Sequence, residues 1–440
     1  MERQQSAQRR SRLRVHAPQI EEREDNPFEN PAEWTPYEVA KVILLFPLAL
    51  VRVILATVLL LVAVLLARIC IIGAPEIEED NGCLYHTAPF SAWRRSLGRP
   101  FVVIVRLITM LFGFFCIEVI DNRRDPEKTA NIVIAAPHLT DFDMMFIYAA
   151  FSEILPAVGD MQIYNAPLVS SAGIANQSIF VDVTSNESKD ACKRAIAMRA
   201  SSAWHGSPLL IFPEGRITNG NVLIRFKAGA FHPGQPVQPV LTRYPFTFYN
   251  PVGQSGANGG IVCGVIRMLT QFYNQVQVEL LDVYEPSPAE QQDPILFAKN
   301  VRQTMADTLN VRVTEHSYED AALFKAAMDA GITPGFVVHD VEEAYAVDLK
   351  QLRHLLADFH RYDVDGNGWI SRDEFEQVLK ETIYADEAPP KAAAQLFDFF
   401  DADGDGCIVY LEFVQAMTLL SGGRDGTHAL DADMVALCPS

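Results

Sequence analysis

The chain has 440 residues, of which 49% are hydrophobic, and its formal net charge is −19. This length predicts two or three domains with enough apolar material for a core, and the negative charge argues against nucleic acid as a partner. Seven cysteines are scattered without a CxxC pair or a zinc-site spacing. That pattern favours reduced thiols in a cytosol-facing protein.

The charge is distributed unevenly along the chain. From His339 to the end there are 21 Asp and Glu against 7 Lys and Arg, so about −14 of the net charge lies in the last quarter. The first sixteen residues instead carry five arginines. Residues 1–37 are polar and predict a disordered N-terminal tail. We expect no secretory signal peptide, because the first apolar run starts late and follows acidic sequence.

Residues 38–120 predict membrane-embedded or interfacial segments. Between Val42 and Gly73 the only charges are Arg52 and Arg68. The uninterrupted run 53–67 is short of the roughly 20 residues that span hydrocarbon, but adding 42–51 suffices if Arg52 snorkels or faces a partner. One tilted span, a re-entrant hairpin and a buried helix pair all remain open. The arginine-rich tail favours a cytosolic N-terminus.

A second apolar stretch runs from Pro100 to Ile120 and contains Arg106 and Glu118. The segment before it, with Trp93 followed by three arginines (Arg94, Arg95, Arg99), suits an amphipathic piece at a membrane interface. A helix that leads into the next domain is the alternative.

Residues 121–315 alternate short apolar runs with helical patterns. This alternation is typical of an α/β domain with a mainly parallel sheet flanked by helices. The expected strands are 132–136, 178–183, 209–213, 237–242 and 276–283. The expected helices are 141–151, 188–203 and 295–309.

The stretch from Ala136 to Asp143 carries the first candidate site. Pro137 ends the strand before it, because proline cannot continue a ladder, and a helix is expected to follow. His138 therefore lies between a strand and a helix, with Asp143 five residues on. In such a pair the imidazole can take a proton while the carboxylate holds its other nitrogen. By itself this spacing also arises by chance.

Further candidate residues follow the expected strand 209–213. They are Glu214, Gly215 and Arg216 in the run Phe212-Pro213-Glu214-Gly215-Arg216, and Lys227 in the later segment Phe226-Lys227-Ala228-Gly229. A proline-flanked strand, 237–240, comes next. A carboxylate suits hydroxyl groups and a cation suits phosphate. For Glu214 a helix N-cap is the structural alternative.

Residues 316–346 are expected to form a helical linker, residues 347–420 an all-α EF-hand lobe, and residues 421–440 a tail. The lobe is predicted from spacing alone, because two twelve-residue loops begin at Asp363 and Asp401 with glycine at position 6. The ligands expected in the first loop are Asp363, Asp365, Asn367, the Trp369 carbonyl, Ser371 and Glu374. Those expected in the second are Asp401, Asp403, Asp405, the Cys407 carbonyl and Glu412. We expect Ca²⁺ at both, more weakly at the second, whose ninth position is Val409. A calcium-free structural lobe is the alternative.

Taken together, the motifs resemble the glycerolipid (PlsC-type) acyltransferase superfamily in order and spacing. The matching segments are His138-x4-Asp143, Ser178–Asp182, Phe212–Gly215, Phe226–Lys227 and the strand 237–240. Three further segments, 26–28, 239–245 and 276–320, resemble the lysophosphatidylcholine acyltransferase branch, which also carries C-terminal EF-hands. The resemblance covers roughly residues 26 to 420.

The resemblance implies a membrane-bound enzyme that transfers an acyl group from acyl-CoA, its co-substrate, to a lysophospholipid in the bilayer. His138 would be the general base and Asp143 would hold its tautomer. Glu214 and Gly215, with the nearby cations Arg216, Arg225 and Lys227, would bind the glycerol-phosphate part of the acceptor. The chain departs from the family at Val183, where many members carry a phosphate-binding arginine, and Arg216 lies one place early.

These departures leave the acceptor open. Acylation of lysophosphatidate or glycerol-3-phosphate is one alternative. A calcium-responsive membrane adaptor with an inactive acyltransferase fold is the other, and only Val183 favours it. The resemblance implies location at the endoplasmic reticulum, with the Golgi and lipid droplets as alternatives.

Overall fold

The computed structural model describes residues 27–28, 34–166, 169–246, 249–253, 260–329, 338, 341, 344, 347–382 and 390–421. The predicted N-terminal and C-terminal tails lie almost wholly outside these residues, as does Asn26 of the 26–28 segment. The chain divides into two compact units. We call Pro27–Thr314 the α/β unit, and we call the described part of Glu315–Ser440 the helical unit.

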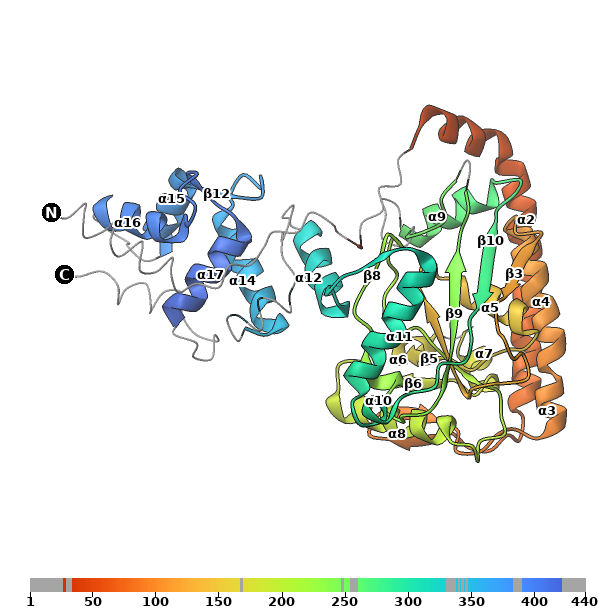
Figure 1. Ribbon diagram of the computed structural model, residues 1–440. Helices are drawn as coiled ribbons and strands as arrows, with labels where there is room; N and C mark the ends of the chain where they lie inside the picture. The colour runs from red at the N-terminus through yellow and green to blue at the C-terminus, as the bar shows by residue number, and fades with distance from the viewer. Residues whose placement is uncertain are drawn as a thin grey trace. The chain divides into compact units, whose positions relative to one another are not determined.

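A five-stranded sheet forms the centre of the α/β unit, in the order β3-β10-β9-β4-β7 (Figure 1). Its strands are β3 (Ile117–Asp121), β4 (Ile132–Ala136), β7 (Leu209–Ile211), β9 (Val237–Arg243) and β10 (Val276–Leu280). Only the β9–β10 pair is antiparallel, while β4 runs parallel to both of its neighbours. The predicted mainly parallel sheet is therefore confirmed.

Strand β4 contributes buried side chains to both faces of this sheet. Its five residues are all buried, as expected of a central strand covered on both sides. Ile132, Ile134 and Ala136 point into one apolar cluster, and Val133 and Ala135 point into the other, because successive side chains alternate between faces. The C-terminal end of β4, where His138 follows, is thus fixed from two sides.

Two smaller sheets and a set of helices complete the α/β unit. A four-stranded sheet has the order β1-β2-β6-β5, and β8 pairs with β11. The remaining strands are β1 (Glu78–Asp80), β2 (Cys83–Tyr85), β5 (Val158–Asp160), β6 (Ile179–Val181), β8 (Val222–Leu223) and β11 (Arg312–Val313). The helices around the sheets are α5 (Asp143–Phe151), α6 (Met161–Asn165), α7 (Ser170–Ala175), α8 (Asn186–Ala200), α9 (Gly260–Leu269), α10 (Pro288–Gln292) and α11 (Pro294–Leu309), with the short 3-10 turn η1 (Ala228–Ala230).

The apolar segment is one continuous helix, α2 (Pro36–Ile71). At 1.5 Å per residue its 36 residues follow a path of about 54 Å, which is bent in Figure 1, and Pro47 lies inside the helix. Thr35 accepts a hydrogen bond from the amide of Glu38 and caps its start. Of the three open forms, the hairpin and the helix pair are therefore wrong. By length and composition α2 qualifies as a membrane span, and it is the one such helix among the described residues.

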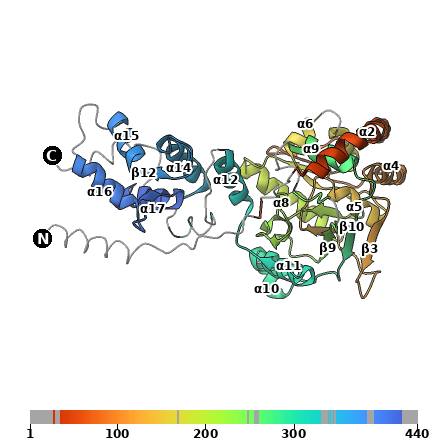
Figure 2. The ribbon, with the colours of Figure 1, turned by 90° about the horizontal axis from the view of Figure 1, so that it is seen from above.

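Helix α2 lies on the outer edge of the α/β unit, next to α4 (Gly98–Leu111), as both views show (Figures 1 and 2). Arg52 is buried, and its guanidinium donates to the carbonyl oxygens of Leu269 and Gln271 at the end of α9. Two roles are predicted for Arg52. It takes the one in which the side chain faces other parts of the protein, and it does not snorkel. The second apolar stretch divides into α4 and β3, and the arginine-rich piece before it forms α3 (Ala92–Ser96).

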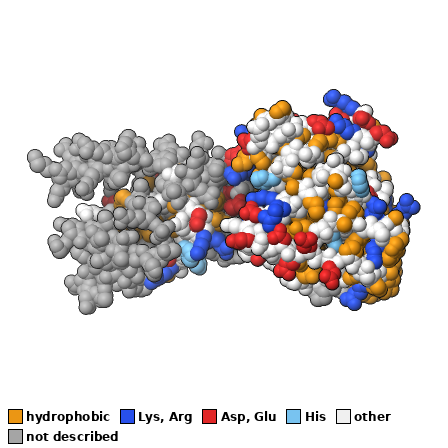
Figure 3. Space-filling model, turned by 90° about the horizontal axis from the view of Figure 1, so that it is seen from below, with side chains coloured by type: hydrophobic (Ala, Val, Ile, Leu, Met, Phe, Trp, Pro, Cys, Tyr) orange, Lys and Arg blue, Asp and Glu red, His pale blue; other side chains and the backbone are white. Residues whose placement is uncertain are grey.

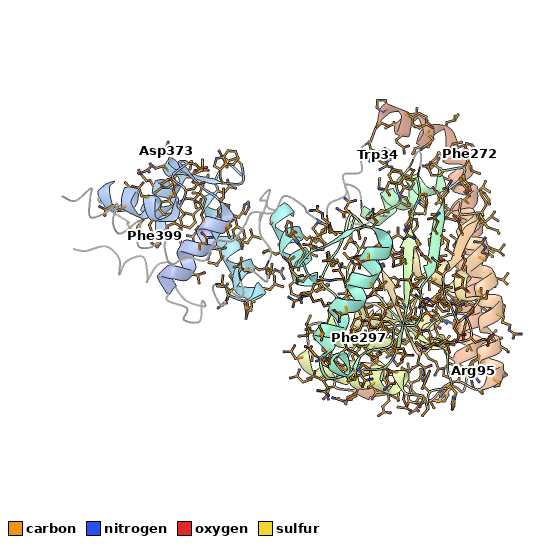
Figure 4. The ribbon with its side chains drawn as sticks, viewed as in Figure 1. Trp34, Arg95, Phe272, Phe297, Asp373 and Phe399 are labelled. Atoms are coloured by element: carbon orange, nitrogen blue, oxygen red, sulfur yellow. The ribbon has the colours of Figure 1, made fainter. Side chains whose placement is uncertain are left out.

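The helical unit contains two helix–loop–helix pairs. Its helices are α12 (Tyr318–Asp329), α14 (Leu349–Tyr362), α15 (Arg372–Thr382), α16 (Pro390–Phe400) and α17 (Tyr410–Ser421). The loops are joined by the short strands β12 (Ile370–Ser371) and β13 (Cys407–Ile408). Phenylalanines from four helices build the core, and Leu323 and Ala327 of α12 are buried in it. The segment predicted as a linker thus contributes to this core. Figure 4 labels Phe399 in this unit and Phe297 in the α/β unit.

Candidate active site

His138 and Asp143 meet directly after strand β4. Nδ1 of His138 lies 2.9 Å from Oδ2 of Asp143, the first residue of α5, whose side chain has 0% exposure. The imidazole is 20% exposed and stacks on Phe212, with 4.2 Å between ring centroids. Because Nδ1 is held by the carboxylate, Nε2 is the nitrogen left to accept a proton from outside.

The main chain around His138 is held by hydrogen bonds from three other segments. The donors to its carbonyl groups come from β9, from the loop after β7 and from the loop after β9. They are Thr242 Oγ1 to Pro137 O (2.9 Å), Thr218 N to His138 O (2.8 Å) and Gly253 N to Leu139 O (2.8 Å). This loop is consequently preorganised, as a catalytic group requires.

Glu214 provides the fourth anchor of this loop. It has 0% exposure, its Oε2 accepts from the amide of His138 at 2.7 Å, and its Oε1 accepts from the amide of Ile224 at 3.4 Å. Burial raises the pKa of this carboxyl to about 7, against the opposing effect of its bonds to these amides. Glu214 lies in a turn, not at a helix start, so the N-cap alternative is wrong. This geometry favours a positioning role, while direct contact with an acceptor stays a prediction.

Gly215 and Lys227 lie against each other beside this turn. Gly215 has a φ of +67°, and a Cβ there would lie 2.9 Å from Nζ of Lys227. Glycine is therefore favoured by the backbone conformation, whereas the exposed lysine side chain could move away from a Cβ. Lys227 is exposed, and its amide donates to Pro213 at 2.8 Å. Arg216 is half-buried and Arg225 is exposed. Their contacts with phosphate stay predictions.

Val183, where the resemblance leads one to expect an arginine, follows β6 and packs against the apolar cluster of α8 and α11. It supplies a hydrophobic contact, so any cation for a phosphate must come from elsewhere. Two residues that sequence reasoning did not assign to the site, Thr140 and Tyr244, bond to Asp143. Tyr244 falls in the matched segment 239–245, but nothing in the sequence pairs it with Asp143.

The two loops of the helical unit bring together six of the eleven predicted calcium ligands. Carboxylate oxygens of Asp363, Asp365 and Glu374 lie within 4.8 Å of one another, as do those of the second set, Asp401, Asp403 and Asp405. Gly368 and Gly406 each have a φ of +92°, the turn that position 6 of such a loop needs. Oxygen ligands of this kind suit Ca²⁺. Val409 is half-buried and its amide donates to Glu412 at 3.1 Å.

Comparison with known families identifies both parts of the chain. Residues 116–243 match the family model described as Acyltransferase, and residues 352–418 match the model of an EF-hand domain pair. The chain thus carries an acyltransferase-family domain followed by an EF-hand pair, and the resemblance that the sequence motifs predict is confirmed.

Among curated proteins, the chain is similar to lysophosphatidylcholine acyltransferases. It is 33% identical to lysophosphatidylcholine acyltransferase 2B of Mus musculus over 76% of this chain and 64% of that protein. It is 30% identical to lysophosphatidylcholine acyltransferase 2 of Homo sapiens over 76% of this chain and 60% of that protein. The chain therefore spans a little under two thirds of the length of these relatives.

Among solved structures, one similar chain is the 1-acyl-sn-glycerophosphate (LPA) acyltransferase PlsC from Thermotoga maritima. The match has a TM-score of 0.40 and 15% sequence identity, and covers 61% of this chain and 96% of that chain.

Replacing Glu214 with Gln tests the buried carboxylate. Its pKa is raised from 4.5 to about 7, so it adds stability that is full below pH 4.5 and is lost as pH rises through 7. We expect the free energy of unfolding of the α/β unit to fall by about 3 kcal/mol between pH 4.5 and 8, and Glu214→Gln to remove that slope. Urea unfolding in a Trp369→Phe background restricts tryptophan fluorescence to the α/β unit. An unchanged slope in Glu214→Gln would contradict the assignment.

Terbium binding tests the two loops separately. Trp369 occupies position 7 of the first loop, so Tb³⁺ bound there is sensitised by its indole, whereas Cys407 holds that position in the second. We expect Glu374→Gln to abolish the sensitised emission, and Glu412→Gln to leave it largely intact. Ca²⁺ titration should displace the Tb³⁺. Emission that survives Glu374→Gln would show that the first loop is not the site.

Proposed function

We propose that the chain is a membrane-bound, acyl-CoA-dependent lysophospholipid acyltransferase that carries a calcium-binding EF-hand pair. The observation that carries the proposal is the His138–Asp143 pair at the end of β4, with Nδ1 and Oδ2 at 2.9 Å in a loop anchored by Glu214. Similarity to lysophosphatidylcholine acyltransferases supports the substrate class.

In the proposed reaction the oxygen of the acceptor hydroxyl attacks the thioester carbonyl carbon of acyl-CoA. Nε2 of His138 takes the hydroxyl proton, which makes a poor nucleophile reactive and is worth about 10²–10⁴ in rate. The C–S bond then breaks, the thiolate of coenzyme A leaves, and the imidazolium returns the proton to it. No acyl-enzyme is required, because the thiolate is already a good leaving group.

Two neighbours would support His138 in this step, and a third residue would serve the acceptor. Asp143 holds the tautomer with the proton on Nδ1 and stabilises the imidazolium. Phe212 stacks on the ring and limits its rotation. Lys227, exposed beside Gly215, offers a positive charge to the phosphate of the acceptor. Residues of the helical unit would hold Ca²⁺ through Asp363, Asp365 and Glu374 in the first loop.

We propose that α2 attaches the α/β unit to the bilayer without crossing it. Large apolar side chains are exposed along the whole outer side of this helix, from Val39 to Ile69. Yet both halves of α2 are tied to the same unit, by Arg52 to α9 and by Arg94, whose guanidinium donates to the carbonyls of Cys70, Ile72 and Gly73. A helix that crossed the bilayer would drag these partners into hydrocarbon.

Side chains that suit a membrane interface lie near both ends of α2, on neighbouring segments. Trp34 and Phe272 are exposed near its first turn, and Arg95 lies near its last (Figure 4). In the end-on view of Figure 3, hydrophobic and basic atoms lie together on the edge of the α/β unit. Anionic headgroups would complement the charge of Arg95.

We place the protein at the endoplasmic reticulum, as the resemblance implies.

Replacing His138 with Ala tests the mechanism. Loss of the base should lower turnover of acyl-CoA by at least about 10²-fold with little change in KM. The matched control is His205→Ala, since His205 is exposed and its side chain carries none of the site contacts. Release of free coenzyme A from membranes that contain the full chain measures the rate. Unchanged turnover in His138→Ala would refute the assigned base.

The same assay decides the acceptor. Lysophosphatidylcholine, lysophosphatidylethanolamine, lysophosphatidate and glycerol-3-phosphate are compared at equal concentration. Preference for lysophosphatidate or glycerol-3-phosphate would replace the proposed acceptor with that alternative. Absence of turnover on all four would favour the membrane adaptor.

Labelling in sealed vesicles tests how α2 lies. Tyr37→Cys and Glu76→Cys introduce exposed thiols before and after the apolar stretch, in a background where the exposed Cys116 is replaced by Ser. An impermeant maleimide should label both from the same side. Fluorophores at Ile43→Cys, Leu55→Cys and Leu65→Cys should share one shallow depth by quenching with brominated lipids. Labelling from opposite sides would establish a span instead.

A further inference from the structure

Tyr244 lies one residue beyond β9, about one hundred positions from the catalytic loop in sequence, and its phenol oxygen donates to Oδ1 of Asp143. We propose that Tyr244, together with Thr140, is a positioning residue that fixes the orientation in which the Asp143 carboxylate meets His138. The inference rests on the proposed function, because it assigns a role in that reaction.

The hydrogen bonds of Asp143 divide between its two oxygens. Oδ2 accepts from Nδ1 of His138 at 2.9 Å and from the amides of Leu139 and Thr140 at 2.7 and 3.1 Å. Oδ1 accepts from Oγ1 of Thr140 at 2.7 Å and from Tyr244. The donors on Oδ1 determine the rotation of the carboxylate, and hence whether Oδ2 points its lone pair at the imidazole.

Tyr244 is itself held in place. It is 7% exposed, and its ring packs edge-on against Phe114 and Phe146, with centroid distances of 6.2 and 5.8 Å. Two residues earlier, Thr242 bonds to the carbonyl of Pro137. Strand β9 thus aligns the phenol and the His138 loop together, so the position of the hydroxyl relative to Asp143 is determined by the sheet.

The high pKa of a buried phenol suits the role of a hydrogen-bond donor to Asp143. Burial, followed by the nearby charge of Asp143, raises the pKa of Tyr244 well above its ordinary value, so the hydroxyl remains a donor at any working pH. Oγ1 of Thr140 lies 3.0 Å from the phenol oxygen, and the two hydroxyls form one small network on Oδ1. Among the described residues Glu214 also faces the His138 loop; it accepts from the His138 amide, and its charge interacts with that of the imidazole.

A buried Tyr–Asp bond can also serve only to satisfy two buried polar groups. The two roles differ in what the enzyme loses when the hydroxyl is removed. A purely structural bond changes the free energy of unfolding and leaves the chemistry of His138 intact. A positioning bond changes the rate of proton transfer and the pH at which the base loses its activity, because the carboxylate then holds the imidazolium differently.

The test replaces Tyr244 with Phe in the full chain, in membranes, and measures kcat, KM and the pH dependence of kcat. We expect kcat to fall about 10- to 100-fold, the range for one hydrogen bond to a charged group, with KM changed less than about threefold. A carboxylate with one donor fewer should bind the imidazolium more tightly, so the acidic limb of the profile should move to higher pH. A kcat within twofold of wild type, or an unmoved acidic limb, would overturn the proposal.

The matched control is Tyr249→Phe. Tyr249 lies in the same loop and is equally buried, but its hydroxyl donates to the carbonyl of Gly264 at 3.0 Å and not to Asp143. The Tyr249→Phe variant should leave kcat and the pH dependence of kcat unchanged. Thr140→Val should reproduce part of the Tyr244→Phe effect and combine with it non-additively, whereas Thr140→Ser, which keeps the hydroxyl, should restore most of the activity.

A readout independent of turnover separates this proposal from the proposed function. The Nδ1 proton of His138 should give a downfield NMR resonance, assigned by its loss in His138→Ala. Tyr244→Phe should shift that resonance and Tyr249→Phe should not. Absence of wild-type turnover with a resonance that shifts in Tyr244→Phe would reject the function and retain the positioning contact. A resonance that does not shift would reject the contact.

Discussion

The amide of His138 donates to a carboxylate that has no exposed surface, and the geometry of the candidate site depends on this bond. An ionised group so deeply buried is costly unless it is well bonded, and burial raises the pKa of Glu214 to about 7. An amide could not replace this carboxyl group, because the two backbone N–H donors need two acceptor oxygens and an amide has one. The two oxygens of Glu214 join the His138 loop to Ile224, in a segment that follows a different strand.

The other residues of the site are positioned around this hydrogen bond by the ends of neighbouring strands. Strand β4 delivers His138 to the carboxyl end of a parallel sheet, where loops from neighbouring strands converge. The loop after β7 brings Phe212 to the imidazole and Glu214 to the amide, and the end of β9 brings Tyr244 to Asp143. The neighbouring strands β9, β4 and β7 therefore all contribute to the dyad and its surroundings. The loop after β7 holds the ring and the amide of His138, and the end of β9 holds the carboxylate of Asp143.

Much of this was predictable from the sequence, and the reasons differ between parts. The bounds of β4 follow from a continuous apolar run that ends at Pro137, and the calcium loops follow from a ligand spacing that few other structures use. The His138–Asp143 contact spans less than two helical turns, so local spacing was enough. The role of Glu214 was different, because sequence gives a residue type and a neighbourhood but not its exposure. The contact of Tyr244 with Asp143 could not be predicted from the sequence, because it depends on the register of β9 against β4.

The same limit applied to α2. Its composition predicts an affinity for lipid, and a hydropathy pattern cannot distinguish a helix that crosses a bilayer from one that lies along a folded unit. In the structure the guanidinium of Arg52 donates to carbonyl groups at the end of α9, and this contact supports the proposal that α2 lies along the folded unit. A charge within an apolar run thus marks the side of the helix that faces protein.

The path of the chain between the α/β unit and the EF-hand pair begins close to Glu214. Strand β11 pairs with β8, and the amide of Thr314 donates to the carbonyl of Leu223 at 3.0 Å. Ile224 is the next residue, and its amide is one of the two that hold Glu214. The last strand before Glu315 is therefore connected through two hydrogen bonds to the carboxylate that accepts from the His138 amide.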